Sequence, residues 1–230
     1  MMIFKLGKEN IFPPVHLAEE NGILAVGGDL SPERLLEAYR CGIFPWFSEG
    51  DPYIWWSPNP RFVLYPKELA VSKSMRKVLR REIFHITYDL CFNDVIQGCK
   101  IAKRRDPGTW ITDEMMAAYI KLHDQGYAHS IEAWKDGVLA GGLYGVSLGR
   151  CFFGESMFSN CSNSSKAAFI SLVRKLGELR FIIDCQVYTD HLHSLGARMI
   201  PRSRFIQILD KALLSETLIG NWGSMPFFYS

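Results

Sequence analysis

The sequence predicts an α+β fold with a mixed sheet, and three observations indicate it. The chain has 230 residues and is 48% hydrophobic, which is enough for the core of one large domain or two small ones. Three strands are expected in series over 127–134, 138–146 and 150–154, with hairpin turns at Asp136-Gly137 and Leu148-Gly149. A helix, a strand and further helices follow the series, and this order is typical of α+β proteins.

The first sixty residues predict a small unit of their own. Its opening elements are short and are interrupted by paired prolines and paired glycines. Ser31-Pro32-Glu33 begins a helix, because serine caps the first N–H groups, proline fits the first turn and the acid faces the positive end of the helix dipole. Gly42 ends this helix, and proline-rich aromatic loops are expected at 43–47 and 55–60.

A domain boundary is expected near residue 62, so that a small N-terminal domain of 1–62 precedes a second domain of 63–230. Hydrophobic periodicity predicts further elements in the second domain, on both sides of the three strands in series. The expected elements are a helix over 72–81, a strand over 84–88, a helix near 92–103, a helix over 113–125, then a helix over 164–178, a strand over 180–187, a short helix near 190–195 and a last helix over 202–214.

The composition excludes several classes of protein. The net charge is only +2, so any signal for nucleic acid must be local. The chain begins without a secretory leader pattern and has no apolar run near the roughly 20 residues of a membrane span, so we expect a cytoplasmic protein. The six cysteines form no Cys-x-x-Cys pair and are expected to be reduced thiols. With His191 and His193 they match no zinc spacing, so no metal site is predicted.

The predicted strand over 180–187 carries two polar residues, Asp184 and Gln186, among apolar ones. Strand side chains alternate between faces, so residues two apart are expected to point the same way. A buried acid and a buried amide must be hydrogen-bonded, either to each other or to a substrate. Glu155, in an aromatic stretch at another strand end, favours the substrate and makes a carboxylate pair with Asp184 conceivable for acid–base work.

A stripe of basic residues is the clearest local signal. The cations recur at helical spacing with no acid over 71–81, and like charges at such spacing repel one another. A one-sign stripe favours a polyanion such as a nucleic-acid backbone over an ordinary solvated helix face. The stripe consists of Lys73, Arg76, Lys77, Arg80 and Arg81, and Lys100, Lys103, Arg104 and Arg105 extend the positive surface.

Four tryptophans, at 46, 55, 56 and 110, stand beside proline or glycine. Most are expected in the core, although one or two can stack on a base. The chain contains no Walker loop and no Gly-x-Gly-x-x-Gly motif. Gly141-Gly142 lies within a predicted strand and indicates a bulge or a close approach of backbone.

Taken together, the motifs resemble those of the bacterial leucyl/phenylalanyl-tRNA–protein transferase family. The resemblance covers about residues 10 to 214, and its motifs are long and unusual. The matching segments are Asn21-Gly22 to Leu30-Ser31-Pro32, Gly42 to Phe47, Trp55-Trp56-Ser57-Pro58, Gly108 to Thr112, His129-Ser130-Ile131-Glu132, Gly154 to Ser159, Ile183 to Val187, Leu195-Gly196-Ala197 and Ile200-Pro201-Arg202.

The resemblance implies a small N-terminal α/β domain followed by an acetyltransferase-like domain. It also implies transfer of leucine or phenylalanine, less readily methionine, from aminoacyl-tRNA to proteins that begin with arginine or lysine. The products then enter degradation that depends on the N-terminal residue. No metal and no cofactor are implied.

Site roles are implied where motifs match. Asp184 and Gln186 match the catalytic acid and amide, with the aspartate polarising the glutamine, and Glu155 matches the acid at the aminoacyl α-amine. Aromatics at the terminal adenosine and the pocket mouth are matched by Trp46 and Trp110, and the basic stripe matches the tRNA-binding helix. Positions in or near the side-chain pocket are matched by Phe153, Met157, Ser159 and Ile183. Two positions depart from the family: Leu143 replaces a methionine and Thr189 an asparagine, and both are expected to alter substrate contacts.

Two other functions stay open from the residues themselves. An acyl-CoA-dependent N-acetyltransferase is one, but its pyrophosphate turn is glycine-rich, whereas the link 160–165 contains no glycine. A non-catalytic RNA-binding module is the other, and it leaves Asp184 and Gln186 unexplained.

Overall fold

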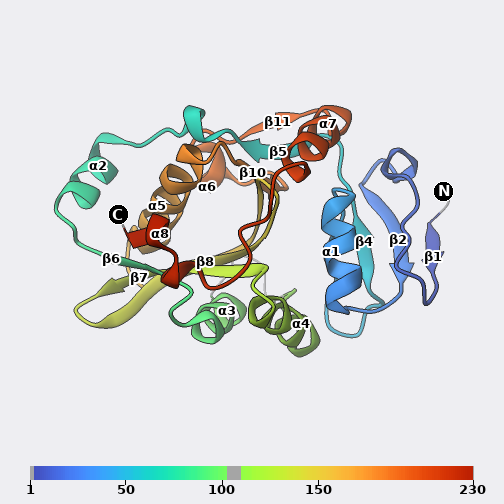
Figure 1. The fold of residues 1–230 in the computed structure, drawn as a ribbon, viewed down its shortest axis with the longest axis horizontal. Coiled ribbons are helices and arrows are strands. Elements are labelled where there is room, and N and C mark those ends of the chain that lie inside the picture. Colours follow the sequence, from blue (N-terminus) through green and yellow to red (C-terminus); the bar gives the residue numbers. More distant parts are fainter. Residues whose placement is uncertain (1–2, 103–109, 230) are drawn as a thin grey trace.

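The computed structural model describes residues 3–102 and 110–229, which form two β-sheets with helices around them (Figure 1). The smaller sheet has four strands, in the order β1-β2-β4-β3, with β1 parallel to β2 and the other pairs antiparallel. Helix α1, Pro32–Arg40, lies beside this sheet. The strands are β1 (Phe4–Leu6), β2 (Ile23–Gly27), β3 (Phe44–Pro45) and β4 (Ile54–Trp56).

The larger sheet has seven strands in the order β11-β5-β10-β9-β8-β7-β6. Only the β9–β10 pair is parallel among these described strands, so the sheet is mixed, as predicted. The strands are β5 (Arg61–Leu64), β6 (His85–Tyr88), β7 (Ala128–Lys135), β8 (Val138–Leu148), β9 (Cys151–Ser159), β10 (Ile182–Gln186) and β11 (Arg198–Ile200).

The helices after β5 lie close to their predicted positions, except the terminal helix α8, which was not predicted. Their bounds are α2 (Lys73–Arg80), α3 (Phe92–Ile101), α4 (Asp113–Asp124), α5 (Ser164–Glu178), α6 (Asp190–His193), α7 (Arg202–Leu213) and α8 (Pro226–Tyr229). Strands β5 and β11 were not predicted, because three or four residues are too few for a periodic pattern. The interpretation of 43–47 and 55–60 as loops is wrong in part, since β3 and part of β4 lie within them.

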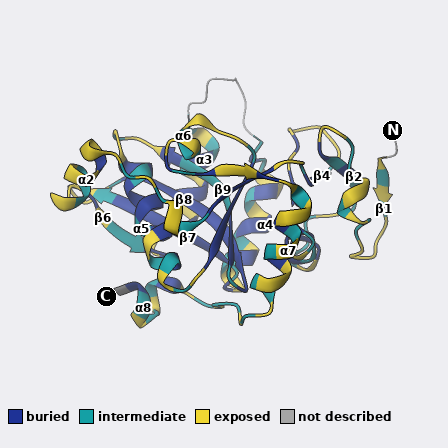
Figure 2. Cartoon of the chain, turned by 90° about the horizontal axis from the view of Figure 1, so that it is seen from above, coloured by how far each residue is buried: buried dark blue, intermediate teal, exposed yellow. Residues whose placement is uncertain are grey.

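Helices α5 and α3 cover opposite faces of the larger sheet. A side chain at Gly141 would meet Ser164 of α5, whereas one at the next residue, Gly142, would approach Val95 of α3. Successive strand residues point to opposite faces, so the two helices lie on opposite sides. The paired glycines thus mark a close approach of backbone, as predicted. Figure 2 shows the sheet strands buried between these layers, with α2 exposed at one end of the molecule and the small sheet at the other.

The two sheets share one hydrophobic core. Leu24 and Leu35 of the N-terminal part belong to the same buried cluster as Val63 and Phe92. The chain passes from one sheet to the other between β4 and β5, and the expected boundary at residue 62 falls inside β5. The division into 1–62 and 63–230 therefore stays a prediction.

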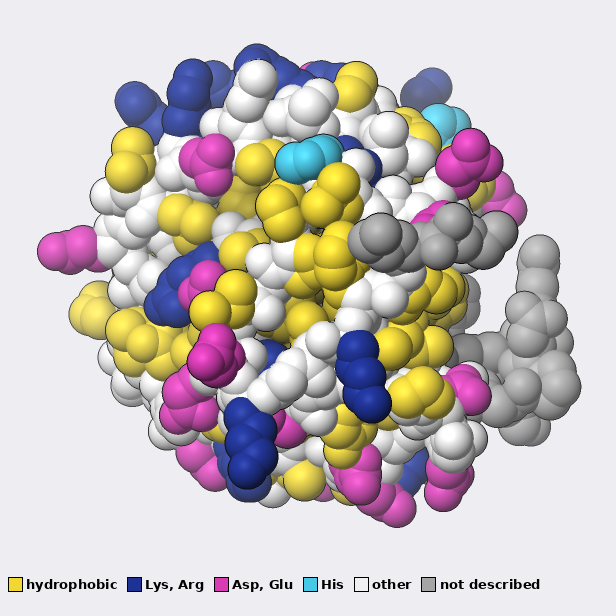
Figure 3. Space-filling view, turned by 90° about the vertical axis from the view of Figure 1, so that its right-hand side faces the viewer, with side chains coloured by type: hydrophobic (Ala, Val, Ile, Leu, Met, Phe, Trp, Pro, Cys, Tyr) yellow, Lys and Arg dark blue, Asp and Glu magenta, His cyan; other side chains and the backbone are white. Residues whose placement is uncertain are grey.

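The described part of the chain contains no helix long and apolar enough to cross a membrane. On the face seen in Figure 3, hydrophobic side chains gather near the centre, lysines and arginines follow the upper edge, and both signs of charge mix below. The small net charge is therefore spread unevenly over this surface.

Candidate active site

The candidate site lies where two neighbouring strands separate. β9 and β10 pair only over Cys151–Phe153 and Ile182–Asp184. β9 runs on to Ser159, whereas β10 ends at Gln186, and both strands line a cavity of about 400 Å³. In the described sheet β9 has no partner strand on this side beyond the short pairing, so six consecutive residues, 154–159, line the cavity.

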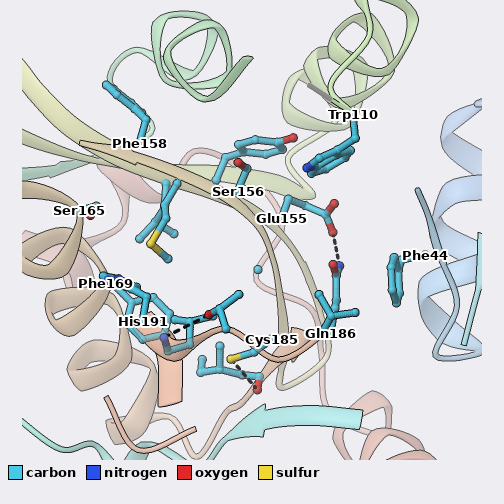
Figure 4. Close-up of a pocket in the computed structure, with 18 of the residues that line it drawn as sticks. Phe44, Trp110, Glu155, Ser156, Phe158, Ser165, Phe169, Cys185, Gln186 and His191 are labelled. Carbon is cyan, nitrogen blue, oxygen red and sulfur yellow. Dashed lines mark hydrogen bonds between the residues drawn. The ribbon is translucent and has the colours of Figure 1, made fainter. Parts of the chain in front are cut away.

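The cavity has an apolar end and a polar end (Figure 4). At the polar end Glu155 and Gln186 face each other, with Trp110 and Phe44 close by. Phe44 belongs to β3, so the small sheet supplies part of the cavity wall. The apolar end is formed by side chains of β8, β9, β10, α5 and α6, namely Leu143, Met157, Phe169, Ile183 and Leu192, whereas the ring of Phe158 points toward α3.

Most of the residues predicted from the sequence are brought together here. Those that line the cavity are Trp46, Trp110, Leu143, Glu155, Met157, Ser159, Ile183, Gln186 and Thr189. Phe153 does not line it: its ring is fully buried behind the cavity, 4.9 Å from that of Tyr39. Asp184 is also fully buried and lies outside the lining.

A bulge in β10 explains why Gln186 reaches the cavity and Asp184 does not. Ile183 and Cys185 line the cavity, so regular alternation would turn both Asp184 and Gln186 away from it. The pairing with β5 shifts register between these two residues, and Gln186 adopts a left-handed φ of 61°. The expectation that both side chains share one face is therefore wrong. The Asp184 carboxylate instead accepts the backbone N–H of Gln186 at 3.0 Å.

Arg61 is the partner of Asp184 that sequence reasoning missed. Its guanidinium donates to both carboxylate oxygens, at 2.8 and 2.6 Å, and both side chains are fully buried. A third N–H of the guanidinium bonds to the carbonyl of Gly42 at 3.1 Å, and the group lies over the rings of Phe44 and Phe205. The only sequence signal was one arginine at the head of an apolar run, Arg61-Phe-Val-Leu.

Glu155 is held by three neutral groups. Its Oε1 accepts from the Tyr39 hydroxyl at 2.7 Å and from Gln186 Nε2 at 2.8 Å, and its Oε2 accepts from the Tyr119 hydroxyl at 2.8 Å. Burial raises the pKa of Glu155 to about 7, although these hydrogen bonds act to lower it. The acid that contacts the side-chain amide of Gln186 is thus Glu155, and Asp184 contacts the backbone N–H of the same residue.

The mouth of the cavity is aromatic. Trp46 is 40% exposed there, and its carbonyl accepts the indole N–H of Trp56 at 2.6 Å. Trp55 is fully buried and donates to the carbonyl of Gly27, as expected for a core tryptophan. Trp46 and Trp110 therefore remain the two tryptophans that face the cavity.

The basic stripe lies on α2, away from the cavity and at the end of the molecule opposite the small sheet (Figures 1 and 2). All five of its cations are exposed, whereas Met75 between them is buried, and Ser72 caps the helix. No ion pair to them occurs within residues 3–102 and 110–229. Lys100 is paired with Asp113, and the predicted extension at Lys103, Arg104 and Arg105 lies outside the described residues.

Sequence comparison identifies the family. The leucyl/phenylalanyl-tRNA protein transferase profile matches residues 63–210, and the profile of the N-terminal domain of these transferases matches residues 28–59. The chain is 60% identical over 228 residues to the leucyl/phenylalanyl-tRNA–protein transferase of Syntrophus aciditrophicus (strain SB), which covers 98% of this chain and 95% of the relative. It is 57% identical over 211 residues to that of Nitrosospira multiformis, with 90% and 91% covered.

The chain belongs to the leucyl/phenylalanyl-tRNA–protein transferase family. The transferase has no glycine in the link between β9 and α5, where Asn163 takes a left-handed conformation. It therefore lacks the glycine-rich turn with which acyl-CoA enzymes hold pyrophosphate. The sequence relationship and this link together disfavour the N-acetyltransferase alternative.

Proposed function

We propose that the cavity is the place where leucine or phenylalanine, and less readily methionine, leaves its tRNA for an acceptor protein. The acceptor is the N-terminal α-amine of a protein that begins with arginine or lysine. The observation that carries the proposal is the division of one cavity into an apolar end and a polar end, with Glu155 and Gln186 at the junction. An aminoacyl group has the same division into an apolar side chain and a polar ester and amine.

The apolar end suits flexible hydrophobic side chains. Met157 lies on one wall, near Phe169 and Ile183, and among the described residues no charged side chain lines this end. Methionine adapts its torsions to different shapes, so one pocket can accept both leucine and phenylalanine. β-Branched side chains should fit worse, because their branch lies close to the backbone and to the walls.

The polar end suits aminolysis of an ester. The ester is already activated, so the protein mainly has to position a neutral amine against its carbonyl carbon. An α-amine has a pKa of about 7.7–8.0 and is partly neutral near pH 7, whereas a lysine side chain near 10.4 is not. In the proposal, Gln186 Oε1 accepts a hydrogen bond from the amine as the C–N bond forms. The ester C–O bond then breaks, and the ribose oxygen of the tRNA leaves with the proton that the amine loses. Asp184 with Arg61 positions Gln186.

The remaining roles follow the matched positions. Glu155 contacts the α-amine of the aminoacyl group, Trp46 and Trp110 hold the terminal adenosine, and Thr189 and Ser159 complete the lining. The basic stripe on α2 binds the tRNA backbone. We place the reaction in the cytoplasm, where the aminoacylated protein is marked for degradation.

A transfer assay tests the proposal. Leucyl-tRNA with a peptide that begins with arginine should give a leucylated peptide, and acetyl-CoA with the same peptide should give nothing. The matched control is the same peptide with an acetylated N-terminus, which removes only the attacking amine. Transfer to the acetylated peptide, or equal transfer to peptides that begin with alanine and arginine, would contradict the proposed acceptor.

A further inference from the structure

Four oxygen atoms of three side chains lie unusually close together at the polar end of the cavity. The Tyr39 hydroxyl is 2.7 Å from Glu155 Oε1, and the Tyr119 hydroxyl is 2.8 Å from Oε2. The two hydroxyls are themselves 2.5 Å apart. The carboxyl group and the two phenols therefore form a closed ring of three O···O contacts.

Each of these contacts needs a hydrogen atom between its two oxygens. Tyrosine hydroxyls bring one hydrogen each, and an ionised carboxylate brings none. Burial and the neighbouring Glu155 raise the pKa of both Tyr39 and Tyr119 well above the usual value, so both keep their hydrogens. Two hydrogens cannot fill three contacts, so the third hydrogen must come from the carboxyl group of Glu155.

The charged groups near these hydrogen-bonded oxygens also favour a protonated Glu155. Asp184 on β10 contributes a negative charge that opposes ionisation of Glu155. Arg61, which could offset it, already gives two hydrogen bonds to Asp184 and is directed at that residue. Tyr39 comes from α1, Tyr119 from α4 and Gln186 from β10, and all three are neutral groups. Within the described residues no ion pair stabilises a negative Glu155.

We propose that Glu155 carries a proton in the free enzyme, and that the ammonium group of the aminoacyl-tRNA replaces this proton on binding. Tyr39 and Tyr119 are then positioning residues, which hold the acid neutral before the substrate arrives and solvate the carboxylate afterwards. The exchange balances: carboxylic acid and free ammonium become a carboxylate–ammonium pair, and one proton goes to solvent. The inference deepens the proposed function, because it rests on contact between Glu155 and the aminoacyl amine.

The exchange gives the site a means to select charged tRNA. A terminal adenosine without an amino acid brings no ammonium, so it leaves the proton on Glu155 and gains nothing at this end of the cavity. An aminoacyl adenosine gains an ion pair in a buried site, where such contacts are strong when both groups are hydrogen-bonded. Its affinity should therefore increase as pH rises toward neutrality and the competing proton becomes scarce.

The first experiment observes the proton directly. Protein labelled with ¹³C at the glutamate carboxyl carbons is titrated by NMR, and the Glu155 signal is assigned through its backbone. We expect this signal to show a protonated acid that titrates near pH 7, well above the ordinary glutamate value of 4.5. A Glu155 signal that is ionised down to the range of the exposed glutamates would overturn the proposal.

The second experiment counts the proton released on binding. The probe is phenylalanyl-adenosine with a 3′-amide in place of the ester, which binds but cannot be transferred. Calorimetry at about pH 6.5 in buffers of different ionisation enthalpy should show release of roughly three-quarters of a proton by wild type, given a pKa of about 7. Glu155→Gln, which keeps the shape of the neutral acid, should release none and bind the probe at least tenfold more weakly.

The matched control is Glu132→Gln. Glu132 is a fully buried acid that, like Glu155, is bonded to two hydroxyls, those of Thr87 and Ser130, but it lies outside the cavity lining. This variant should release the same fraction of a proton as wild type, and adenosine alone should release none from any of the proteins. Equal release by wild type and Glu155→Gln would assign the proton to the amine and overturn the proposal.

Transfer of leucine to a peptide that begins with arginine is measured on the same wild-type sample. An active enzyme with an ionised Glu155 would overturn the proton exchange and leave the proposed function standing. A protonated Glu155 in a protein without transfer activity would overturn the proposed function and leave the protonation of Glu155 standing.

Discussion

Two acids, the fully buried Asp184 and the partly buried Glu155, lie on the two sides of β10, and their surroundings give them opposite properties. On the side away from the cavity, Asp184 meets the guanidinium of Arg61, so its charge is neutralised by a fixed cation. On the cavity side, Glu155 meets two phenols and an amide, and its pKa is raised to about 7. The same functional group is thus a charged structural anchor in one place and a readily protonated cavity group in the other.

The difference in partners explains why the two acids are suited to different roles in this site. An acid paired with a buried cation cannot take a second cation without losing the first, so Asp184 is suited to hold the backbone of Gln186. An acid without a cation of its own is suited to receive one from a substrate. The hydrogen-bonding partners of the two carboxyl groups, a guanidinium for Asp184 and two phenols with an amide for Glu155, account for this difference.

The largest expected effect is on folding. Asp184→Asn keeps the shape of the side chain but leaves the Arg61 charge uncompensated in the core, and removing one partner of a buried pair costs about 3–5 kcal/mol. Glu155→Gln removes no cation's partner and should cost less than about 1 kcal/mol near pH 7. Urea unfolding of both variants beside wild type measures this. Equal losses would mean that the two acids do not differ as described.

The next effect concerns pH and has a definite sign. The folded pKa of Glu155, about 7, lies above the ordinary value of 4.5. The native state therefore binds the proton more tightly, and the resulting stability is fully present below about pH 4.5 and lost as pH rises through about 7. Wild type should lose on the order of 3 kcal/mol relative to Glu155→Gln over this range. Unfolding free energies of the two proteins at several pH values should diverge accordingly, and parallel curves would contradict the raised pKa.

A third test separates positioning from folding. Arg61→Lys keeps a positive charge but cannot make the two-point contact with Asp184, so Gln186 should be held less well and turnover should fall by about tenfold. Affinity for tRNA should not change. Arg34→Lys is the matched control, because Arg34 is equally buried but bonds to Gly7, Glu9 and Asp29 in the N-terminal part. If both variants lose turnover alike, Arg61 has no special relation to Gln186.

The fourth test concerns the exposed charges of α2. Arg76→Glu with Arg80→Glu should weaken tRNA binding by up to about tenfold and lower the salt slope by roughly 0.9 for each phosphate that the variant no longer neutralises. Lys5→Glu with Lys8→Glu, two exposed lysines at the opposite end of the molecule, is the control. An unchanged salt slope in the α2 variant would return the stripe to an ordinary solvated face.

The smallest effect is expected at the apolar end. Leu143 is almost fully buried, lines the cavity and lies opposite Met157 across the β8–β9 pair. Leu143→Met should change the ratio of leucyl to phenylalanyl transfer by a few-fold and stability by under about 1.5 kcal/mol. Competition between the two charged tRNAs measures the ratio, with Leu148→Met on the same strand as the control. Identical ratios would mean that residue 143 does not govern side-chain selection.

The predictable part of the structure is the part with local causes. Ser31 caps its helix as expected, and Thr112 caps α4 in the same way, because the cap bond joins residues three apart. Asp136 and Gly137 both adopt left-handed φ values in the predicted hairpin turn. The family motifs also pointed to most of the cavity-lining residues from the sequence alone.

The unpredicted part depends on distant contacts. Arg61 meets a residue 123 positions away, and Tyr39 meets one 80 positions away, so no local pattern marks either as a site residue. The bulge at Gln186 was not predicted, because the rule that side chains alternate between faces holds only for a strand with regular pairing. A single left-handed residue, Gln186, interrupts that pairing. The missed contacts and the missed bulge both lie around Asp184, Glu155 and Gln186, where the site departs from regular strand structure.

The point at which β9 and β10 separate determines how long the cavity between them is. A strand advances about 3.3 Å per residue, so each further residue of β9–β10 pairing would close that much of the opening. The left-handed turn at Gln186 stops the pairing just after Asp184. The length of the cavity is therefore set by backbone pairing before any side chain refines it, and a change at the stop would resize the substrate range in whole residue steps.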